Sequence, residues 1–240
     1  MNNQEILRSY KNVFDKPTIK SIWEMITQRK FEGLESPIKI GKESNVFSAL
    51  TKSNERIAVK IYRINVSDFF QMSKYLSMDK RFPPIKRRMQ IVLTWARREF
   101  INLKKAYGCG VSVPRPIGIK NNVLAMEFIG ARFPEHPQAF PLLKDRCDNP
   151  KAMYEKVLDN IKRIYQKAGL VHGDLSEFNI INMDGEPVII DFSHAIPSNN
   201  HSAEELLVRD MEKIVKFFKK KGLDLELDNE LKKVKGAKGD

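Results

Sequence analysis

The sequence contains few cysteines and no long apolar run. Its two cysteines, Cys109 and Cys147, have the spacing of neither a metal-binding nor a redox motif, so we expect two reduced thiols. No apolar segment approaches the roughly 20 residues that a membrane-spanning helix needs. The first residues also lack the basic and apolar regions of a signal peptide. Together these absences predict a cytoplasmic protein.

Internal repeats and low-complexity linkers are also absent from the 240 residues. The composition is 42% hydrophobic and 30% charged, which supplies enough apolar material for a core and argues against global disorder. A chain of this length suits one large domain or two closely packed lobes.

Acidic residues are the scarcer charged type, since 30 Asp and Glu against 42 Lys and Arg give a net charge of +12. Positive charge favours polyanionic partners, although a lysine-rich surface without a partner has the same composition. Between residues 80 and 105, basic residues outnumber the single acid, Glu99, and such an asymmetric run favours an interaction surface. The basic residues of this run are Lys80, Arg81, Lys86, Arg87, Arg88, Arg97, Arg98, Lys104 and Lys105.

Hydrophobic periodicity in the first half predicts short helices followed by strands. Two amphipathic helices are expected before residue 35, and they either pack on the domain or form a docking module. Strand signals begin near residue 38. A small antiparallel sheet is expected from residues 46–50, 57–62 and 123–128.

The longer helices are expected at 89–107, 149–169 and 203–219. Asn149 suits the N-cap of the second of these and Gly169 its C-terminal cap. A further hairpin is expected across Asp184-Gly185, a strong turn signal. Residues 130–148 are expected to be irregular. The chain after residue 222 shows some apolar alternation at Leu223, Leu225 and Leu227 and is then expected to fray.

The chemically most specific segment is Val-His-Gly-Asp-Leu-Ser-Glu-Phe-Asn at residues 171–179. Asp174 and Asn179 have the spacing of a kinase catalytic loop, and Asp191 closes an apolar strand just downstream. We expect Asp174 to accept or orient the proton of an attacking hydroxyl, and Asn179 and Asp191 to bind magnesium. Taken singly, either aspartate could instead cap a turn.

Lys60 and Glu99 are expected to form an ion pair. Lys60 lies on an otherwise apolar strand, where an unpaired charge is costly. Glu99 interrupts the apolar stripe of the 89–107 helix, so it is either the partner of Lys60 or an exposed carboxylate at the edge of that stripe. In a kinase, Lys60 would grip the α- and β-phosphates of the nucleotide.

The loop at residues 36–46 occupies the place of a glycine-rich phosphate loop but has one glycine, Gly41. The small Ser44 would let phosphate approach the backbone, and Lys42 would meet its charge. Just past the 123–128 strand, Glu127 and Ile129 are expected to present backbone groups to adenine.

These segments together resemble the RIO family of atypical protein kinases, most closely its Rio-one branch. The resemblance covers residues 36–218. Its most specific pieces are Gly-Lys-Glu-Ser-Asn-Val-Phe at 41–47, Ala-Val-Lys-Ile-Tyr-Arg at 58–63, Met-Glu-Phe-Ile-Gly at 126–130 and the catalytic-loop segment at 170–179.

The resemblance implies an α+β, two-lobed, protein-kinase-like fold, with an antiparallel sheet and a helix in the N-lobe and a reduced, mainly helical C-lobe. The expected parts are a helical extension at 1–35, the N-lobe at 36–129, the C-lobe at 130–222 and a tail at 223–240.

The resemblance also implies ATP with Mg²⁺ or Mn²⁺ as cofactors and serine autophosphorylation. Asp174 and Asp191 would be the catalytic residues, and Lys42, Ser44, Lys60, Glu127, Ile129 and Asn179 would bind ATP. It further implies ATP hydrolysis through an aspartyl-phosphate at Asp191. The implied role is maturation of the small ribosomal subunit, with a pre-small-subunit particle or its rRNA as the partner of the basic stretch 80–105.

Three departures from ordinary protein kinases are features of the RIO pattern. No arginine follows His172, Ser193 replaces the glycine of the Asp-Phe-Gly motif, and no Ala-Pro-Glu motif follows. Because 49 residues follow Asp191, a full activation segment with peptide-docking helices does not fit. Activation-loop phosphorylation is therefore not expected to be the switch.

Three other interpretations remain open. One is the small kinase of the tRNA-threonylcarbamoylation complex, or an aminoglycoside-type phosphotransferase; the loops at 41–45 and 176–179 and the N-terminal helices argue against both. Another is an ATP-gated ribosome-assembly switch with little transfer to protein. The last is a structural RNA-binding protein without nucleotide.

Overall fold

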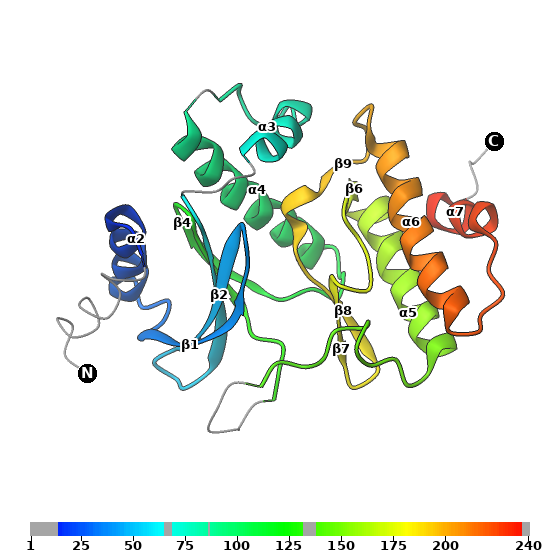
Figure 1. Cartoon of the computed structure of the whole chain (residues 1–240), viewed down its shortest axis with the longest axis horizontal. Helices are drawn as coiled ribbons and strands as arrows, with labels where there is room; N and C mark the ends of the chain where they lie inside the picture. Colours follow the sequence, from blue (N-terminus) through cyan, green and yellow to red (C-terminus); the bar gives the residue numbers. More distant parts are fainter. Residues whose placement is uncertain (1–13, 65–68, 86, 132–137, 237–240) are drawn as a thin grey trace. The chain divides into compact units, whose positions relative to one another are not determined.

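The computed structural model describes residues 14–64, 69–85, 87–131 and 138–236. The chain divides into two compact units (Figure 1). The N-terminal unit comprises residues 1–100 and 116–139, and the C-terminal unit comprises residues 101–115 and 140–240. Residues 101–115, which the sequence assigns to the N-lobe, thus group with the second unit. The first of the two predicted N-terminal helices lies almost wholly outside the described residues.

An antiparallel sheet forms the centre of the N-terminal unit, with the strand order β1-β2-β3-β5-β4. Its strands are β1 Gly33–Ile40, β2 Ser44–Leu50, β3 Arg56–Tyr62, β4 Pro116–Lys120 and β5 Val123–Glu127. The three strands expected from the sequence are confirmed. β1 begins earlier than residue 38, and β4 was not expected because Pro116 was interpreted as part of a connection. As the edge strand, β4 tolerates a proline that cannot donate a ladder hydrogen bond.

Helices pack on both faces of this sheet. All residues of β3 after Arg56 are buried, so both faces of this central strand are covered. Val59 and Ile61 belong to one core cluster, which includes apolar residues of α2 (Lys16–Thr27). Tyr62 belongs to another, which joins residues of α3 (Phe69–Met78) and α4 (Arg88–Gly108). Alternation along β3 therefore places Lys60 on the same face as Tyr62. Helix α3 was not expected from the sequence.

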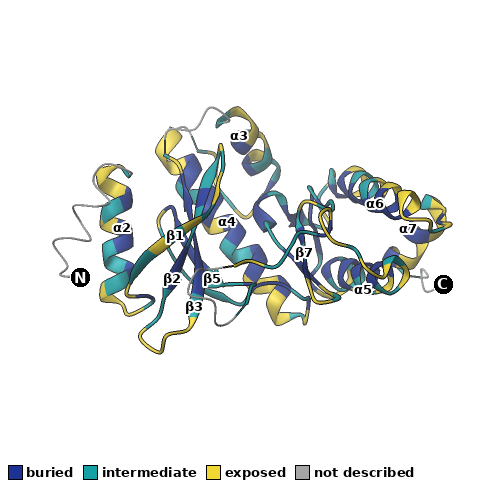
Figure 2. Ribbon diagram, turned by 60° about the horizontal axis from the view of Figure 1, so that its bottom comes forward, coloured by how far each residue is buried: buried dark blue, intermediate teal, exposed yellow. Residues whose placement is uncertain are grey.

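Three helices and a hairpin dominate the C-terminal unit. Helices α5, α6 and α7 lie side by side (Figure 1), and α6 carries one buried and one exposed face (Figure 2). They span α5 Pro150–Lys162, α6 Ala203–Lys220 and α7 Leu227–Lys235, and a π-helix, Arg163–Lys167, continues α5. The strands pair as β6 Leu170–Val171 with β9 Ile196–Pro197, and as β7 Ile180–Met183 with β8 Glu186–Ile189.

Local signals read from the sequence are confirmed in this unit. The side chain of Asn149 caps α5 by accepting a hydrogen bond from the backbone N–H of Ala152. Gly169 follows the helix with φ +54°. Asp184 and Gly185 turn the β7–β8 hairpin with φ values of 48° and 91°, both in the left-handed region that this turn requires.

The expectation that the chain frays after residue 227 is wrong for residues 228–235, because they belong to α7, which packs on the unit. Val234 of α7 is fully buried. Glu230 is also buried and accepts a hydrogen bond of 2.6 Å from the Tyr154 hydroxyl of α5. Burial raises the pKa of Tyr154 above its usual range, and the hydrogen bond to this carboxylate raises it further. No helix among the described residues is long and apolar enough to cross a membrane.

Candidate active site

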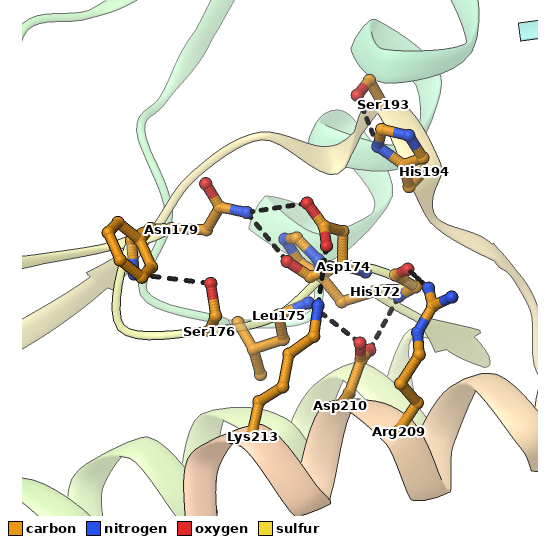
Figure 3. A network of polar contacts seen from close by, with 12 residues as sticks. His172, Asp174, Leu175, Ser176, Asn179, Ser193, His194, Arg209, Asp210 and Lys213 are labelled. Carbon is orange, nitrogen blue, oxygen red and sulfur yellow. Dashed lines mark hydrogen bonds and ion pairs between the residues drawn. The ribbon is translucent and has the colours of Figure 1, made fainter. Parts of the chain in front are cut away.

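The loop between β6 and β7, residues 172–179, carries Asp174 near its start and Asn179 at its end (Figure 3). The side-chain amide nitrogen of Asn179 donates to the backbone carbonyl of Asp174 at 2.8 Å and lies 3.4 Å from its carboxylate oxygen Oδ2. Because the nitrogen of this amide is turned toward Asp174, its oxygen is the atom left to act as a metal ligand.

Asp191 lies beside this loop, two residues after the end of the hairpin strand β8. The backbone N–H of Ile190 donates to the carbonyl of Asn179 at 3.0 Å, which connects the two metal-ligand candidates. Asp191 itself has φ 66° and ψ 68°, a left-handed conformation that is costly for a residue other than glycine and that clusters at functional sites. The hydroxyl of Ser193 donates to Asp191 Oδ1 at 2.7 Å. The structure thus brings the three predicted residues together.

The buried side chain of His172 contacts the backbone of both Asp174 and Ile190, the residue before Asp191. Its Nε2 lies 3.0 Å from the carbonyl oxygen of Ile190, and its Nδ1 accepts from the backbone N–H of Asp174 at 3.4 Å. Burial lowers the pKa of His172, although the carboxylates of Asp210, Asp191 and Asp174 act in the opposite direction. A neutral imidazole that donates from Nε2 and accepts at Nδ1 satisfies both contacts.

Helix α6 holds the loop from below in Figure 3. Asp210 accepts two backbone hydrogen bonds, from Gly173 at 2.7 Å and from Leu175 at 2.9 Å. Burial raises the pKa of Asp210, while His172 and these two bonds lower it. Arg209 donates to the carbonyl of Gly173, and Lys213 Nζ lies 2.8 Å from Asp174 Oδ1.

Sequence reasoning missed these three residues of α6. One signal was present for Asp210, since this acid interrupts a helical stripe of apolar residues much as Glu99 does. The stripe consists of Leu206, Leu207, Met211, Ile214, Val215 and Phe218, all buried. Nothing in the periodicity identifies which loop such an acid contacts.

In the N-terminal unit the structure places Lys60 and Glu99 together. Lys60 Nζ lies 2.9 Å from Glu99 Oε1, and the side chains are 8% and 2% exposed. Glu99 is therefore not an exposed edge carboxylate. The hydroxyl of Tyr62, which sequence reasoning missed, donates to Glu99 Oε2. Lys60 Nζ also lies 5.0 Å from the centroid of the Tyr62 ring.

The other residues expected to bind ATP lie on separate elements of this unit. Lys42 is exposed, and Ser44 begins β2, where its carbonyl accepts from the backbone N–H of Gly41 at 3.0 Å. A Cβ at position 41 would lie 2.8 Å from that oxygen, so the tight turn requires the loop's single glycine. Glu127 ends β5, and Ile129 follows it in a buried position. Their roles toward ATP stay predictions.

The interpretation of the stretch 80–105 as one surface is wrong for Arg98. Arg98 Nε lies 3.3 Å from Asp79 Oδ2, and neither side chain is exposed. Burial lowers the pKa of Arg98 to about 10. Arg81 pairs with the same carboxylate at 2.6 Å. The exposed basic residues in the described part of this stretch are Lys80, Arg81, Arg87, Arg88, Arg97, Lys104 and Lys105, and Lys86 lies outside the described residues.

The donor set of the C-terminal unit fits Mg²⁺ bound between protein and phosphate. No three His, Cys, Asp or Glu side chains of the described residues cluster as a metal cage. Asn179 and Asp191 instead offer two hard oxygen ligands. Mg²⁺ is commonly held by one or two protein carboxylates, with water and phosphate oxygens completing its shell.

Comparison with known proteins connects these features to one family. The family model of the RIO domain matches residues 45–231. The RIO-type serine/threonine-protein kinase Rio1 of Haloferax volcanii is 42% identical over 231 residues, which cover 96% of this chain and 78% of that protein. The protein of the same name in Methanocaldococcus jannaschii is 36% identical over 238 residues, 98% of this chain and 80% of that protein.

A solved structure shows the same fold. It is the complex of the Rio2 kinase from Chaetomium thermophilum described as ADP/Mg²⁺-phosphoaspartate, with a TM-score of 0.65 and 21% identity. The match covers 90% of this chain and 65% of that one. The predicted α+β, protein-kinase-like fold is confirmed.

Proposed function

This chain belongs to the RIO family and is a serine/threonine-protein kinase, and we propose that Asp174, Asn179 and Asp191 form the centre at which it transfers the γ-phosphoryl group of ATP. The observation that carries the assignment is the pairing of the Asn179 amide with Asp174 in a loop joined to Asp191. This pairing supports a role for the Asp174 carboxylate as acceptor of the proton and for the Asn179 and Asp191 oxygens as metal ligands.

Each residue has a distinct task in this proposal. The Asp174 carboxylate accepts the hydrogen bond of a serine hydroxyl and takes its proton as the oxygen attacks the γ-phosphorus. The oxygens of Asn179 and Asp191 hold Mg²⁺, which when bound neutralises charge on the phosphate oxygens. The Ser193 hydroxyl keeps the Asp191 carboxylate oriented.

ATP is proposed to bind to the N-terminal unit through the residues expected from the sequence. Lys60, held by Glu99, contacts the α- and β-phosphates, and Lys42 and the backbone near Ser44 contact phosphate. Backbone groups of Glu127 and Ile129 bind adenine. The ADP and Mg²⁺ named for the Rio2 complex support this choice of cofactors, and Mn²⁺ is proposed as an alternative metal.

The test is transfer of label from γ-labelled ATP with Mg²⁺ by the purified chain. Asp174→Asn removes the proton acceptor and keeps the shape, so transfer should fall at least 10²-fold, in the range for loss of a general base, about 10²–10⁴. ATP affinity, measured by calorimetry, should stay within a few-fold. Transfer by this variant at the wild-type rate would overturn the assignment of Asp174.

We also propose that Asp191 accepts the γ-phosphoryl group in an ATP-hydrolysing cycle. Its carboxylate oxygen would bond to phosphorus as ADP leaves, and water would then release phosphate. The phosphoaspartate named for the Rio2 complex and the left-handed backbone of Asp191 support this second activity. A hydroxylamine-labile phosphoenzyme that persists in Asp191→Asn would refute it. Turnover far above protein phosphorylation would favour an ATP-gated switch.

The proposed partner is a pre-small-subunit ribosomal particle or its rRNA, encountered in the cytoplasm. Arg87, Arg88 and Arg97 are exposed and support binding to a phosphate backbone. Each arginine that neutralises a phosphate should steepen the dependence of log affinity on log salt by about one unit of slope. Replacing these three arginines by Gln should therefore flatten that slope in a titration with small-subunit rRNA, and an unchanged slope would refute their binding to phosphate.

A further inference from the structure

The catalytic loop lacks a cation of its own. Residues 172–179 contain no Lys or Arg, yet negative charge must be balanced on the oxygens of a transferring phosphoryl group. We propose that Lys213 of α6 is a catalytic residue that donates a hydrogen bond, with its positive charge, to the γ-phosphoryl oxygens. This role of Lys213 rests on the proposed phosphoryl transfer.

Geometry places this lysine at the reacting carboxylate. Lys213 Nζ lies 2.8 Å from Asp174 Oδ1, and Asn179 Nδ2 lies 3.4 Å from the other oxygen of that carboxylate. Figure 3 shows Lys213, Asp210 and Arg209 reaching the loop from the same helix. Since the proposed acceptor hydroxyl binds Asp174 while its oxygen attacks phosphorus, an ammonium on Asp174 also lies close to the incoming phosphoryl group.

The three side chains of α6 differ in what they contact. Arg209 and Asp210 bind backbone atoms of residues 173 and 175, which fixes the course of the loop. Lys213 contacts the side chain of Asp174 instead. These two side chains are 37% and 45% exposed, and ion pairs at such exposure contribute little to stability. Holding the loop in place is therefore a weak explanation for Lys213.

The length of the lysine side chain suits the proposed role. Its flexible four-carbon stem and three N–H donors allow Nζ to contact Asp174 and a phosphoryl oxygen at once. The helix that carries Lys213 is packed on the core of the unit, which fixes the base of this side chain close to the loop. Electrostatic catalysis requires charges that are positioned before the reaction. Met211 and Ile214, beside Lys213 on α6, are fully buried.

The step balances without any further reactant. The serine oxygen bonds to the γ-phosphorus, and the bond from that phosphorus to the bridging oxygen breaks, leaving its electron pair on ADP. The serine proton passes to Asp174. Lys213 forms no covalent bond and keeps its protons. It acts by stabilising negative charge on the oxygens of the transferring γ-phosphoryl group. Stabilisation that grows in the transition state raises kcat more than it lowers KM.

The experiment compares four variants in steady-state release of ADP with Mg²⁺ and in transfer of labelled phosphate. Lys213→Ala should lower kcat by roughly 10–100-fold, while the KM for ATP changes less than about threefold. Lys213→Arg should restore much of the rate, because it returns the charge. Lys213→Gln should not, because it keeps a hydrogen-bond donor without charge. Lys216→Ala, one turn along α6 at an exposed position, is the matched control and should behave as wild type.

The outcomes separate this inference from the proposed function. Wild-type chain that neither binds nor turns over ATP with Mg²⁺ would refute phosphoryl transfer itself. Active wild type with Lys213→Ala or Lys213→Gln within twofold in kcat would refute only the role of Lys213. An equal loss in Lys216→Ala, or a loss in Lys213→Ala accompanied by a large fall in melting temperature and no rescue by Arg, would also overturn it.

Discussion

Buried ionisable side chains in this protein are arranged in pairs and networks. Lys60 and Glu99 pair inside the N-terminal unit, with Tyr62 as a third member. In the C-terminal unit, His172 and Asp210 are buried among backbone hydrogen bonds of the catalytic loop. Removing one member of such a pair lowers the free energy of unfolding by more than the intact pair adds to it, because the remaining buried charge loses its partner.

Lys60→Met should therefore destabilise the protein as well as impair catalysis. The unpaired Glu99 should lower the free energy of unfolding by about 3–5 kcal/mol in urea titrations. The double variant with Glu99→Leu should recover much of this stability without recovering turnover. A single variant with unchanged stability, KM and kcat would contradict the role of the pair.

The lowered pKa of His172 predicts that the protein loses stability in mild acid. Its pKa lies below the ordinary value of 6.5 in the folded state, so the unfolded chain binds the proton more readily. The stabilising contribution is present above pH 6.5 and is lost as the pH falls below it. Melting temperatures measured from pH 7.5 to 5 should decline, and they should decline less steeply in His172→Gln. Parallel curves for the two proteins would refute this origin.

At the scale of elements, α6 serves as a platform for the catalytic loop. Its buried apolar face packs into the unit, and Asp210 on that face binds the N–H groups of Gly173 and Leu175. The two residues on either side of Asp174 in the chain are thereby held by one carboxylate. The position of Asp174 thus depends on Asp210, which lies 37 residues after Gly173 and 35 residues after Leu175 in the chain.

Asp210→Asn should loosen this loop, because an amide offers one acceptor oxygen where the carboxylate offers two. Backbone amides of Gly173 and Leu175 should exchange with deuterium faster, and kcat should fall by about tenfold or more as Asp174 loses its alignment. Glu212→Gln, at an exposed position of the same helix, is the control. Unchanged exchange at both amides would contradict the platform role.

On the scale of the whole molecule, the RIO domain match includes residues of both compact units. Candidate nucleotide contacts lie in the N-terminal unit, and the residues proposed for phosphoryl transfer lie in the C-terminal unit. The net charge of +12 is spread over the chain, although Asp79 neutralises part of the basic stretch. Nucleotide binding is the property that most directly tests whether the whole chain acts as an enzyme.

ATP with Mg²⁺ should stabilise the intact chain. A ligand at 100 times its dissociation constant adds about 2.7 kcal/mol to the free energy of unfolding, which raises the melting temperature measurably. EDTA should remove most of the rise if Asn179 and Asp191 hold the metal, and Asp191→Asn should do the same. No rise at saturating nucleotide would instead favour the structural RNA-binding interpretation.

The sequence alone determined strands β2, β3 and β5, the three longer helices, the caps of α5 and the Asp184-Gly185 turn, and it singled out the residues proposed for phosphoryl transfer. These follow from periodicity and motif spacing, which are local in the chain. Tertiary structure decided the partners: Tyr62 for Glu99, Asp79 for Arg98, Asp210 for the loop backbone and Lys213 for Asp174. Periodicity shows which face of a helix is buried, but a contact between segments distant in the chain depends on how the elements pack.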